Sequence, residues 1–577
     1  MDRQQRVVDH IVDQLAATGV DYLFGVDGAN IEDLYDAAYF HDGVTAVLAK
    51  HEFSAATMAD GFSRAGCGLG VVMATSGGGS LNLVPGLGES LASRVPVLAL
   101  IGQPPTAMDG RGSFQDTSGR NGALDAQALF SAVSVYCRRI TSAEQILTAL
   151  PEAIAAAWRG GPAVLLLPKD IQQSLVPVRS RLSSAPEPTT VGDPWPIARA
   201  LRRARGSVTI IAGEQVARDD ARDELERLRA LLRARVATVP DAKDVSGSPG
   251  LGSSSSLGVT GVMGHPGIAD AIRDSALCLL IGTRLNVTAR TGLEEGLGGA
   301  PTMSMGSAAP YLACTHIHTD DLKASLSQLA MMLSGYGRRP NGVRVPEVVG
   351  HEELVPPRYD GDGIRYREAV SALDAVLPDD VDIVVDAGNT GASAIHNLPV
   401  RRSGRFIVAL GMGGMGYSFG AAIGMAFGRG RRVVVVAGDG SFFMHGMEMH
   451  TAWQYRLPIT FVLFNNNAHA MCVTREQLYY RDIYSYNRFR PANLGAGLAA
   501  MLPGLHSVDV AEAGQLRSAL GEALAGDGPS VVSIECSADE IPPFAPFLAA
   551  LQKSGSFIGP QGRPTTEESR PHVAARA

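Results

Sequence analysis

Short apolar runs alternate with amphipathic patterns along most of the chain, and this alternation predicts an α/β protein. The runs are rich in Val and Leu and show little polar alternation, as in parallel strands that helices cover on both faces. We expect strands at Val44–Leu48, Gly70–Ala74, Val95–Ile101, Ala163–Leu167, Val208–Ala212, Leu277–Gly282, Ile383–Val385, Arg432–Ala437 and Ile459–Phe464. Residues 1–20 and Arg218–Arg233 show the periodicity of amphipathic helices.

Two polar stretches divide the chain into three blocks. Pro177–Pro196 is rich in Pro and Ser and Pro346–Gly363 in Pro, Gly and Asp, so both are predicted to be linkers. The blocks cover residues 1–176, 197–345 and 364–548. Because each block repeats the same style, we predict an α/β fold of three doubly wound parallel-sheet domains. Gly247–Gly258 is expected to be a loop, and residues 554–577 a loose tail.

Composition and charge narrow the class of protein. With 45% hydrophobic and 19% charged residues, the 577-residue chain is not a largely disordered protein. The net charge of −8 lacks the excess of positive charge that is typical of nucleic-acid-binding proteins. The six Cys form no CxxC pair, which argues against a zinc site or a disulfide framework. The sequence has neither a signal-peptide pattern nor an apolar run of about 18 residues, so we expect a cytoplasmic protein without a membrane span.

The strongest chemical signal lies where two expected strands end. One strand ends in Gly438-Asp439-Gly440-Ser441, Asp439–Leu457 is expected to be a loop plus a helix, and the next strand ends at Asn466. Because parallel strands open on the same edge of a sheet, Asp439 and Asn466 should meet there. A carboxylate and an amide oxygen suit Mg²⁺ or Ca²⁺, and the glycines would let backbone N–H groups approach a phosphate. The segment therefore predicts a metal-bridged diphosphate.

The whole segment resembles the thiamine diphosphate (ThDP) motif of the family of acetolactate synthases and 2-oxo acid decarboxylases. The resemblance covers about residues 5–175 and 365–545 well, and the middle block only loosely. It implies ThDP and Mg²⁺ as cofactors. The implied metal ligands are Asp439, Asn466 and the backbone carbonyl of Ala468, and the implied diphosphate contacts include Gly438, Gly440 and Ser441.

The first block contains two further elements of this family. Lys50–Arg64 is similar to the family's HExxAAxxAdGyaR element, and the resemblance implies that Glu52 hydrogen-bonds N1′ of the aminopyrimidine and so assists removal of the C2 proton. Thr75–Asn82 resembles the TSGPGatN loop, although Gly78 replaces the usual Pro. Cofactor contacts are implied there for Thr75, Gly77 and Asn82.

Ser113–Asp116 resembles the FQE element of the synthases, where Gln115 would point its amide at the reacting carbon. The synthases carry a Lys further along the chain where this sequence has Val135, which predicts a less cationic pocket mouth. His469 follows the second strand end and is either an acid–base group or a structural loop residue.

The third block contains two more elements. Asp386–Thr390 stands where the synthases have DVGQH, and Asn389 and Thr390 would donate to the diphosphate. Gly413–Tyr417 resembles the GTMGFG element. By this resemblance Met415 is the wedge that bends the cofactor, and the carbonyl of Gly413 accepts from its 4′-amino group.

Three loops of the middle block resemble, loosely, loops that hold FAD in many synthases. They are Gly261–Gly267, Ile281–Asn286 and His318–Asp320. Glycine-rich loops are weak evidence, so FAD is possible but not favoured.

Taken together, the resemblance implies an enzyme that decarboxylates a 2-oxo acid, with pyruvate the expected substrate, and transfers the acyl carbanion to an acceptor carbonyl. Glu52, Gln115 and His469 are the candidate catalytic residues. In the family the site lies between subunits, which implies a homodimer or homotetramer. Two alternatives stay open: a simple decarboxylase that releases an aldehyde, and a non-catalytic subunit of the same fold.

Overall fold

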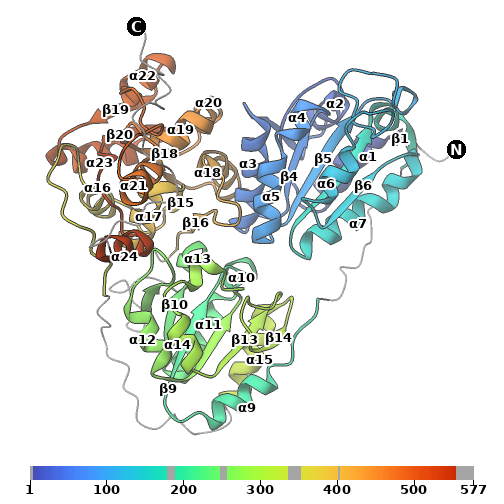
Figure 1. Ribbon diagram of the computed structural model, residues 1–577. Coiled ribbons are helices and arrows are strands. Elements are labelled where there is room, and N and C mark those ends of the chain that lie inside the picture. Colours follow the sequence, from blue (N-terminus) through green and yellow to red (C-terminus); the bar gives the residue numbers. More distant parts are fainter. Residues whose placement is uncertain (1–3, 179–188, 247–255, 335–351, 401–402, 554–577) are drawn as a thin grey trace, which may run out of the picture.

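The computed structural model describes residues 4–178, 189–246, 256–334, 352–400 and 403–553. It contains three six-stranded sheets, all of whose strand pairs are parallel, and confirms the predicted α/β class (Figure 1). Parts of both predicted linkers and the whole tail 554–577 lie outside the described residues. Among the described residues, no helix has the length and apolar character needed to cross a membrane.

The first domain is built on a sheet of strand order β3-β2-β4-β5-β7-β6. Its strands are β2 (Tyr22–Val26), β3 (Thr45–Leu48), β4 (Gly70–Ala74), β5 (Val97–Gln103), β6 (Tyr136–Arg139) and β7 (Pro162–Pro168), and β1 (Gln4–Arg6) pairs antiparallel with β8 (Leu175–Pro177). Its helices are α1 (Val7–Ala17), α2 (Glu32–Tyr39), α3 (Glu52–Arg64), α4 (Gly78–Leu81), α5 (Val84–Ser93), α6 (Ala126–Ser131), α7 (Ile146–Trp158) and α8 (Lys169–Gln173), with 3₁₀ turns η1 (Thr106–Met108) and η2 (Ala143–Gln145).

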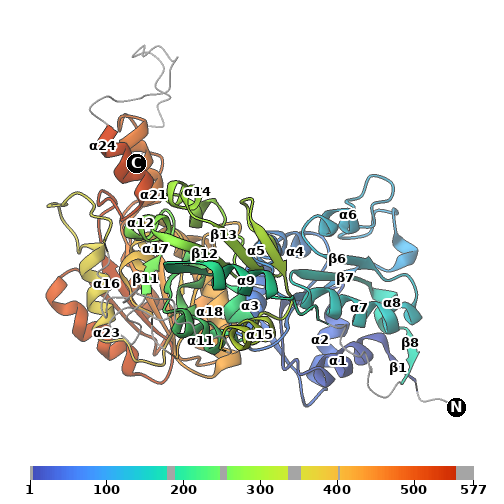
Figure 2. The same cartoon turned by 90° about the horizontal axis from the view of Figure 1, so that it is seen from below.

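The middle domain has the strand order β11-β10-β9-β12-β13-β14 and a hydrophobic core of its own. Its strands are β9 (Ser207–Ala212), β10 (Arg235–Thr238), β11 (Ser256–Val259), β12 (Ser275–Ile281), β13 (Thr302–Gly306) and β14 (Thr315–His318). Its helices are α9 (Trp195–Arg203), α10 (Gln215–Arg218), α11 (Arg222–Leu232), α12 (Gly267–Arg273), α13 (Val287–Arg290), α14 (Glu294–Gly299) and α15 (Leu322–Ser334), with the 3₁₀ segment η3 (Pro240–Val245). Figure 2 shows this domain in green across the other two.

The third domain has the strand order β16-β15-β17-β18-β20-β19. Its strands are β15 (Asp382–Val385), β16 (Phe406–Val408), β17 (Val433–Gly438), β18 (Ile459–Asn465), β19 (His506–Val510) and β20 (Ser530–Glu535). Its helices are α16 (Tyr366–Asp374), α17 (Gly388–Asn397), α18 (Tyr417–Arg429), α19 (Asp439–His445), α20 (Met449–Gln454), α21 (Ala470–Tyr479), α22 (Leu494–Met501), α23 (Leu516–Ala525) and α24 (Ala545–Lys553), with η4 (Gly446–Glu448) and η5 (Ala513–Gln515).

Three sequence expectations need correction. Part of the expected N-terminal helix is strand β1, because these residues pair with the end of the same domain. Ser256–Gly258 of the expected loop belongs to β11, where the chain adds an outer strand beside β10. No loop follows β17, because α19 begins directly at Asp439.

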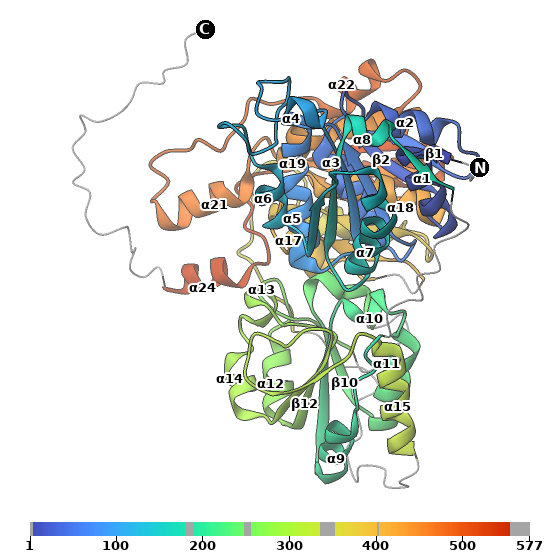
Figure 3. The same ribbon diagram turned by 90° about the vertical axis from the view of Figure 1, so that its right-hand side faces the viewer.

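The first and third domains pack through helices α3 and α18 (Figure 1, Figure 3). Glycines make the close approach possible. A Cβ placed on Gly424 would lie 1.9 Å from the carbonyl oxygen of Met58, and one on Gly61 would lie 2.4 Å from that of Ala421. The two backbones are therefore in direct contact, and we call this helix contact and its flanking loops the seam.

One arginine joins all three domains. Arg405, just before β16, donates from Nε to Oδ2 of Asp244 in the middle domain at 2.5 Å. Its Nη1 donates to the backbone carbonyl of Arg64 in the first domain at 2.5 Å. Because Arg405 and Asp244 are both buried, this contact fixes the middle domain against the seam.

We predict that Gly424→Ala destabilises the protein, because the added methyl group meets backbone that cannot move aside. Overpacking typically costs about 1–3 kcal/mol, which corresponds to about 2–4 °C of melting temperature per kcal/mol in a domain of 150–250 residues. The control is Gly521→Ala in α23, where no atom lies within 4 Å of the added Cβ and helix propensity predicts a small gain. Equal melting temperatures for the two variants by scanning calorimetry would contradict the seam.

Candidate active site

The ends of β17 and β18 bring the predicted metal ligands to one edge of the third sheet. The strands pair in parallel from Val433↔Ile459 to Gly438↔Phe464, so Asp439 and Asn466 follow neighbouring strand ends. Asp439 accepts from the backbone N–H of Ala468 through Oδ2 at 3.1 Å. The structure thus brings together the three residues that the sequence assigned to a metal.

Two of the predicted metal ligands carry a buried side-chain oxygen that has no hydrogen-bond partner among the described residues. These oxygens are Oδ1 of Asp439 and Oδ1 of Asn466. The amide group of Asn466 is oriented by its Nδ2, which donates to the hydroxyl of Tyr366 at 3.0 Å. Unpaired buried oxygens are costly, and a carboxylate with an amide oxygen is the donor set of a hard cation. These residues fit Mg²⁺.

Burial raises the pKa of Asp439 to about 7, although backbone N–H groups, among them that of Ala468, oppose the rise. A bound cation would reverse this effect by favouring the carboxylate. Among the described residues, no group of three or more His, Cys, Asp and Glu is arranged to hold a metal, so the proposed site relies on a single carboxylate.

Helices α17 and α19 begin beside this edge and form the candidate diphosphate site. Neither helix has a side-chain N-cap, so backbone N–H groups of the first turns, apart from those of Asp439 and Gly440 that face the Asp439 carboxylate, are available to an anion. The hydroxyl of Thr390 lies 3.6 Å from the position of a Cβ on Gly438. Asn389 is buried, its Nδ2 lies 3.4 Å from the hydroxyl of Thr474, and its Oδ1 has no partner among the described residues.

Asp386, which the sequence analysis did not select as a site residue, is the hub of this region. Its carboxylate accepts from the backbone N–H of Gly416 at 3.0 Å and from the hydroxyls of Ser418 at 2.7 Å and Ser441 at 2.6 Å. Ser441 was expected at the diphosphate, and the structure shows that its hydroxyl binds Asp386. The signal in the sequence was an Asp directly after the β15 strand.

Met415 and His469 both lie against Gly440, the second glycine of the GDG motif. A Cβ on Gly440 would lie 2.6 Å from Nδ1 of His469 and 3.3 Å from Cε of Met415. The ring of Phe489 meets His469 edge-on, with centroids 4.8 Å apart. Nδ1 of His469 is buried and has no hydrogen-bond partner among the described residues, which suits an acid–base group in a pocket.

Glu52 opens α3 in the first domain and is buried. Its Oε2 accepts from Nδ2 of Asn82 at 2.9 Å, so Asn82 holds Glu52, a contact that the sequence did not suggest. A Cβ on Gly79 would lie 2.9 Å from Oε1, so the loop that contains Asn82 packs closely against the carboxylate. The carboxylate therefore has a fixed orientation.

Thr75, Gly77 and Gln115 form a second contact group beside Glu52. Oε1 of Gln115 lies 3.3 Å from the hydroxyl of Thr75. Its side chain also lies 2.8 Å from the position of a Cβ on Gly77, which has a φ of +63° that favours glycine.

Val135 is not at the mouth of this site. It lies just before β6, and its N–H donates to the carbonyl of Pro162 at the start of β7. Because Thr75 follows the opposite end of the same sheet, replacement of the family's Lys by Val135 does not make the pocket mouth less cationic.

The two groups of site residues adjoin along the seam. The ring of His445, at the end of α19, lies 4.2 Å from the ring of Phe53, the residue after Glu52. A Cβ on Gly414, next to Met415, would lie 3.5 Å from the Phe53 ring.

A separate cavity of about 690 Å³ lies where the three domains meet. The Gly282–Asn286 part of the loop expected near FAD lines it, and the other two expected loops do not. The lining includes Arg94, Arg218, Arg284 and Arg290. The guanidinium of Arg284 stacks over the ring of Tyr311 at 4.1 Å from its centroid.

Comparisons with known proteins agree with this geometry. Models of the N-terminal, central and C-terminal domains of thiamine pyrophosphate enzymes match residues 5–123, 196–302 and 386–534. The chain is 26% identical to the acetolactate synthase isozyme 2 large subunit of Escherichia coli, covering 94% of this chain and 98% of that one. It is 28% identical to a protein described as probable acetolactate synthase large subunit of Methanocaldococcus jannaschii, covering 82% of each.

A solved structure shares the fold. It is described as a thiamin diphosphate-dependent enzyme from Mycobacterium smegmatis, with a TM-score of 0.76 and 23% identity over 93% of this chain and 100% of that one.

We predict that Asp439→Asn lowers the affinity for ThDP and Mg²⁺, because it removes the carboxylate among the three predicted metal ligands. Changes to groups that only orient metal ligands already cost 10–100-fold in affinity, so the loss should be at least about 100-fold. Asp527→Asn, on the exposed surface of the same domain, is the control. Titration calorimetry that finds equal affinities for the two variants would rule out this metal site.

Metal and cofactor binding should also depend on pH through Asp439. With a raised pKa of about 7, this carboxyl group holds a proton in the metal-free protein below that pH, and a cation must displace it. Apparent affinity should therefore fall about tenfold per unit as pH drops below about 7 and level off above it. The measurement is calorimetry in buffers of different ionisation enthalpy, corrected for free Mg²⁺–ThDP. An affinity independent of pH would contradict the assignment.

Proposed function

Because the chain belongs to the thiamine pyrophosphate enzyme family, we propose that it is a ThDP- and Mg²⁺-dependent carboligase. It decarboxylates a 2-oxo acid, pyruvate in the first instance, and transfers the acyl unit to an acceptor carbonyl. The observation that carries the proposal is the pair of unpaired buried oxygens on Asp439 and Asn466 at the strand edge that a diphosphate-binding helix shares.

The residues of the third domain anchor the cofactor in this proposal. Asp439, Asn466 and the carbonyl of Ala468 hold the metal, and the first turns of α17 and α19 receive the diphosphate. Asp386 holds the N–H of Gly416 and so fixes Met415 beside the cofactor. Bound ThDP supplies a nucleophilic carbon and an electron sink for decarboxylation.

The residues of the first domain move and orient protons. Glu52 has one oxygen engaged by Asn82 and the other, Oε1, in no described hydrogen bond, so Oε1 is available to share a proton with the aminopyrimidine. In this proposal Gln115, together with His469 of the third domain, orients the acceptor and exchanges a proton with it. Because Glu52 and Asp439 serve the same reaction from different subunits, the active form is a homodimer or a multiple of it.

A simple decarboxylase is the second candidate. His469, with its buried and unpartnered Nδ1, favours it as a proton source for aldehyde release. The resemblance of Phe114 and Gln115 to the synthase element favours carboligation.

The cavity at the junction of the domains is the candidate site for FAD, if the protein binds it. Its arginines would accommodate the phosphates of a nucleotide. Flavin absorbance of the purified protein decides whether FAD is bound, and the proposed reaction does not require it.

We predict that Glu52→Gln binds ThDP normally but slows exchange of the C2 proton. The amide keeps the size of the side chain and cannot share the proton, and acid–base assistance is typically worth about 10²–10⁴-fold. The measurement is hydrogen–deuterium exchange at C2 of bound ThDP, read by quenched-flow NMR. The control is Glu476→Gln, which removes a buried carboxylate of α21 outside the proposed proton path. Exchange at the unmodified rate in Glu52→Gln would refute this role.

Product analysis separates the two candidate reactions. With ¹³C-labelled pyruvate and a panel of 2-oxo acid, aldehyde and ketone acceptors, a carboligase gives labelled acyloins or acetohydroxy acids by mass spectrometry. Since each 1.4 kcal/mol of barrier difference changes the product ratio about tenfold, one route should dominate. Labelled acetaldehyde as the main product with every acceptor would establish the decarboxylase.

A further inference from the structure

Two buried carboxylates reach across the seam in opposite directions. Glu89, on α5 of the first domain, binds the loop before α18 of the third domain. Glu448, in η4 of the third domain, binds the turn before α3 of the first domain. Both side chains are almost fully buried, with 2% and 1% of their surface exposed. Neither is used by the proposed reaction.

Glu89 holds two consecutive backbone N–H groups. Its Oε1 accepts from Gly411 at 3.2 Å and its Oε2 from Met412 at 2.6 Å. Arg64, at 3.3 Å, supplies a counter-charge. Burial opposes the charge, but Arg64 and the N–H of Met412 outweigh it and lower the pKa of Glu89. Gly411 and Met412 directly precede Gly413 and lead to Met415.

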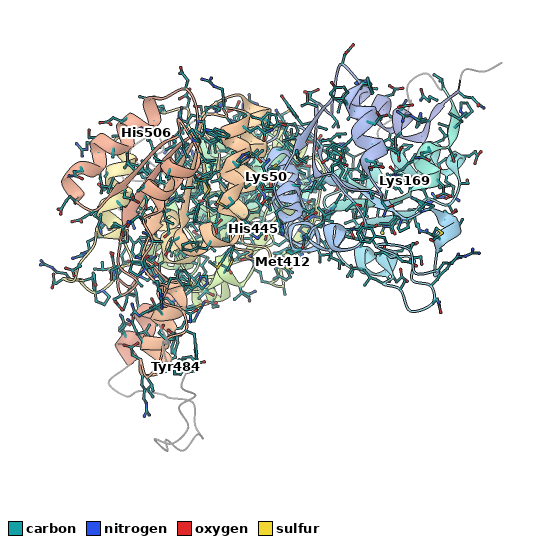
Figure 4. The ribbon with its side chains drawn as sticks, turned by 90° about the horizontal axis from the view of Figure 1, so that it is seen from above. Lys50, Lys169, Met412, His445, Tyr484 and His506 are labelled. Atoms are coloured by element: carbon teal, nitrogen blue, oxygen red, sulfur yellow. The ribbon has the colours of Figure 1, made fainter. Side chains whose placement is uncertain are left out.

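Glu448 holds the turn that contains the catalytic glutamate. Both of its carboxylate oxygens lie 3.1 Å from the backbone nitrogen of Lys50, two residues before Glu52. The hydroxyl of Thr451 donates to the same carboxylate at 2.7 Å. Burial raises the pKa of Glu448, while the hydrogen bonds from Thr451 and Lys50 oppose the rise. Figure 4 labels Lys50 and Met412, the two residues held, both in the zone where the first and third domains meet.

The two contacts occupy equivalent places in the two domains. Counted along the chain within each domain, the first and third sheets have the same strand order, 2-1-3-4-6-5. The turn after the second strand opens α3 in one sheet and α18 in the other, and those turns are the ones held. The carboxylates come from the helical segments after the third strand, β4 or β17. In each domain, therefore, a carboxylate from the segment after the third strand holds the turn after the second strand of the other domain.

We propose that Glu89 and Glu448 are positioning residues, each of which holds a cofactor-contacting turn of the opposite domain in register. The proposal rests on the proposed function, because it assigns Gly413, Met415 and Glu52 to ThDP. Neither carboxylate touches the cofactor. Their effect reaches it through the backbone of residues 411–412 and of Lys50.

The chemistry of the contacts distinguishes the two sites. The hydroxyl of Ser93 donates to Oε1 of Glu89 at 2.7 Å. The other partners are N–H groups, which cannot accept in return: Gly411 and Arg64 at Oε1, and Met412 at Oε2. A glutamine would turn its own NH₂ group toward at least one of these N–H groups, so Glu89→Gln should no longer hold the loop of the third domain. Around Glu448, the hydroxyl of Thr451 can also accept, so Glu448→Gln should be tolerated and Glu448→Ala should not.

The first test needs no cofactor. Amide hydrogen exchange of the apo protein, read by mass spectrometry, reports directly on the N–H groups held. We expect Glu448→Ala to expose peptides around residue 50 and Glu89→Gln to expose peptides around residues 411–412, each by about tenfold or more in rate, with Glu448→Gln close to the unmodified protein. Glu224→Gln, a buried glutamate of the middle domain, is the control and should change neither peptide. Unchanged exchange rates in both Glu448→Ala and Glu89→Gln would overturn the proposal.

The second test asks whether the register matters to the cofactor. Glu448→Ala should bind Mg²⁺–ThDP within a few-fold of normal but slow C2–H exchange at least tenfold, with rescue by Glu448→Gln. Glu89→Gln should instead weaken ThDP binding, because Gly413 and Met415 shift. If the unmodified protein binds no ThDP, the proposed function is refuted. The amide exchange of the apo protein then still tests whether Glu89 and Glu448 hold the two turns. If it binds ThDP and both variants match it, the positioning role is refuted.

Discussion

The first and third sheets share one hydrophobic core, and the placement of every candidate site residue depends on it. Val72 and Ile101 of the first sheet belong to the same buried cluster as Val435 and Phe461 of the third. The opposite faces of these sheets pack into separate clusters. Since α3 and α18 lie inside the shared core and touch backbone to backbone, their first turns have little freedom to move. Glu52 and Met415 stand at those turns.

A buried polar network crosses the same core. Arg64 pairs with Asp60 at 2.9 Å and with Glu89, and the hydroxyl of Tyr417 donates to Asp60. Replacing such charges with apolar groups is often neutral for stability, so stability alone does not account for them. Hydrogen bonds and ion pairs are directional, so they fix how α3 is rotated relative to α18, which apolar packing does not do. We infer that the network contributes orientation more than folding energy.

The sequence predicted what depends on local pattern. Gly70–Ala74 was placed with the bounds that β4 has, because a central strand buried on both faces is a continuous apolar run. Edge strands β6, β14 and β19 were not predicted, since their half-buried residues do not form such runs. Strands β2, β10, β13, β16 and β20 were also not predicted, although most of their residues are buried. Asp439 and Asn466 could be paired because adjacent parallel strands open on one edge.

Contacts between distant parts of the chain could not be predicted. Glu89 meets Met412 across 323 positions and Glu448 meets Lys50 across 398, and neither has a local motif. Asp386 was visible only as the acid that begins a diphosphate element. The role of Asn82 changed for the same reason, because its partner Glu52 is 30 positions away on another helix.

The strand orders explain why the chemistry is divided between two of the three domains. The first and third sheets share an order in which the helices after the second strand, α3 and α18, face each other, so each presents its first turn at the seam. The middle sheet has the order 3-2-1-4-5-6 and cannot offer an equivalent turn. It contributes Asp244, which holds Arg405 against the seam, and most of the arginine-lined cavity. Glu52 and Asp439, the proposed proton-transfer and metal-binding residues, therefore belong to separate domains. Because the first and third domains pack against each other along the seam, the seam residues control their relative orientation without altering Glu52 or Asp439.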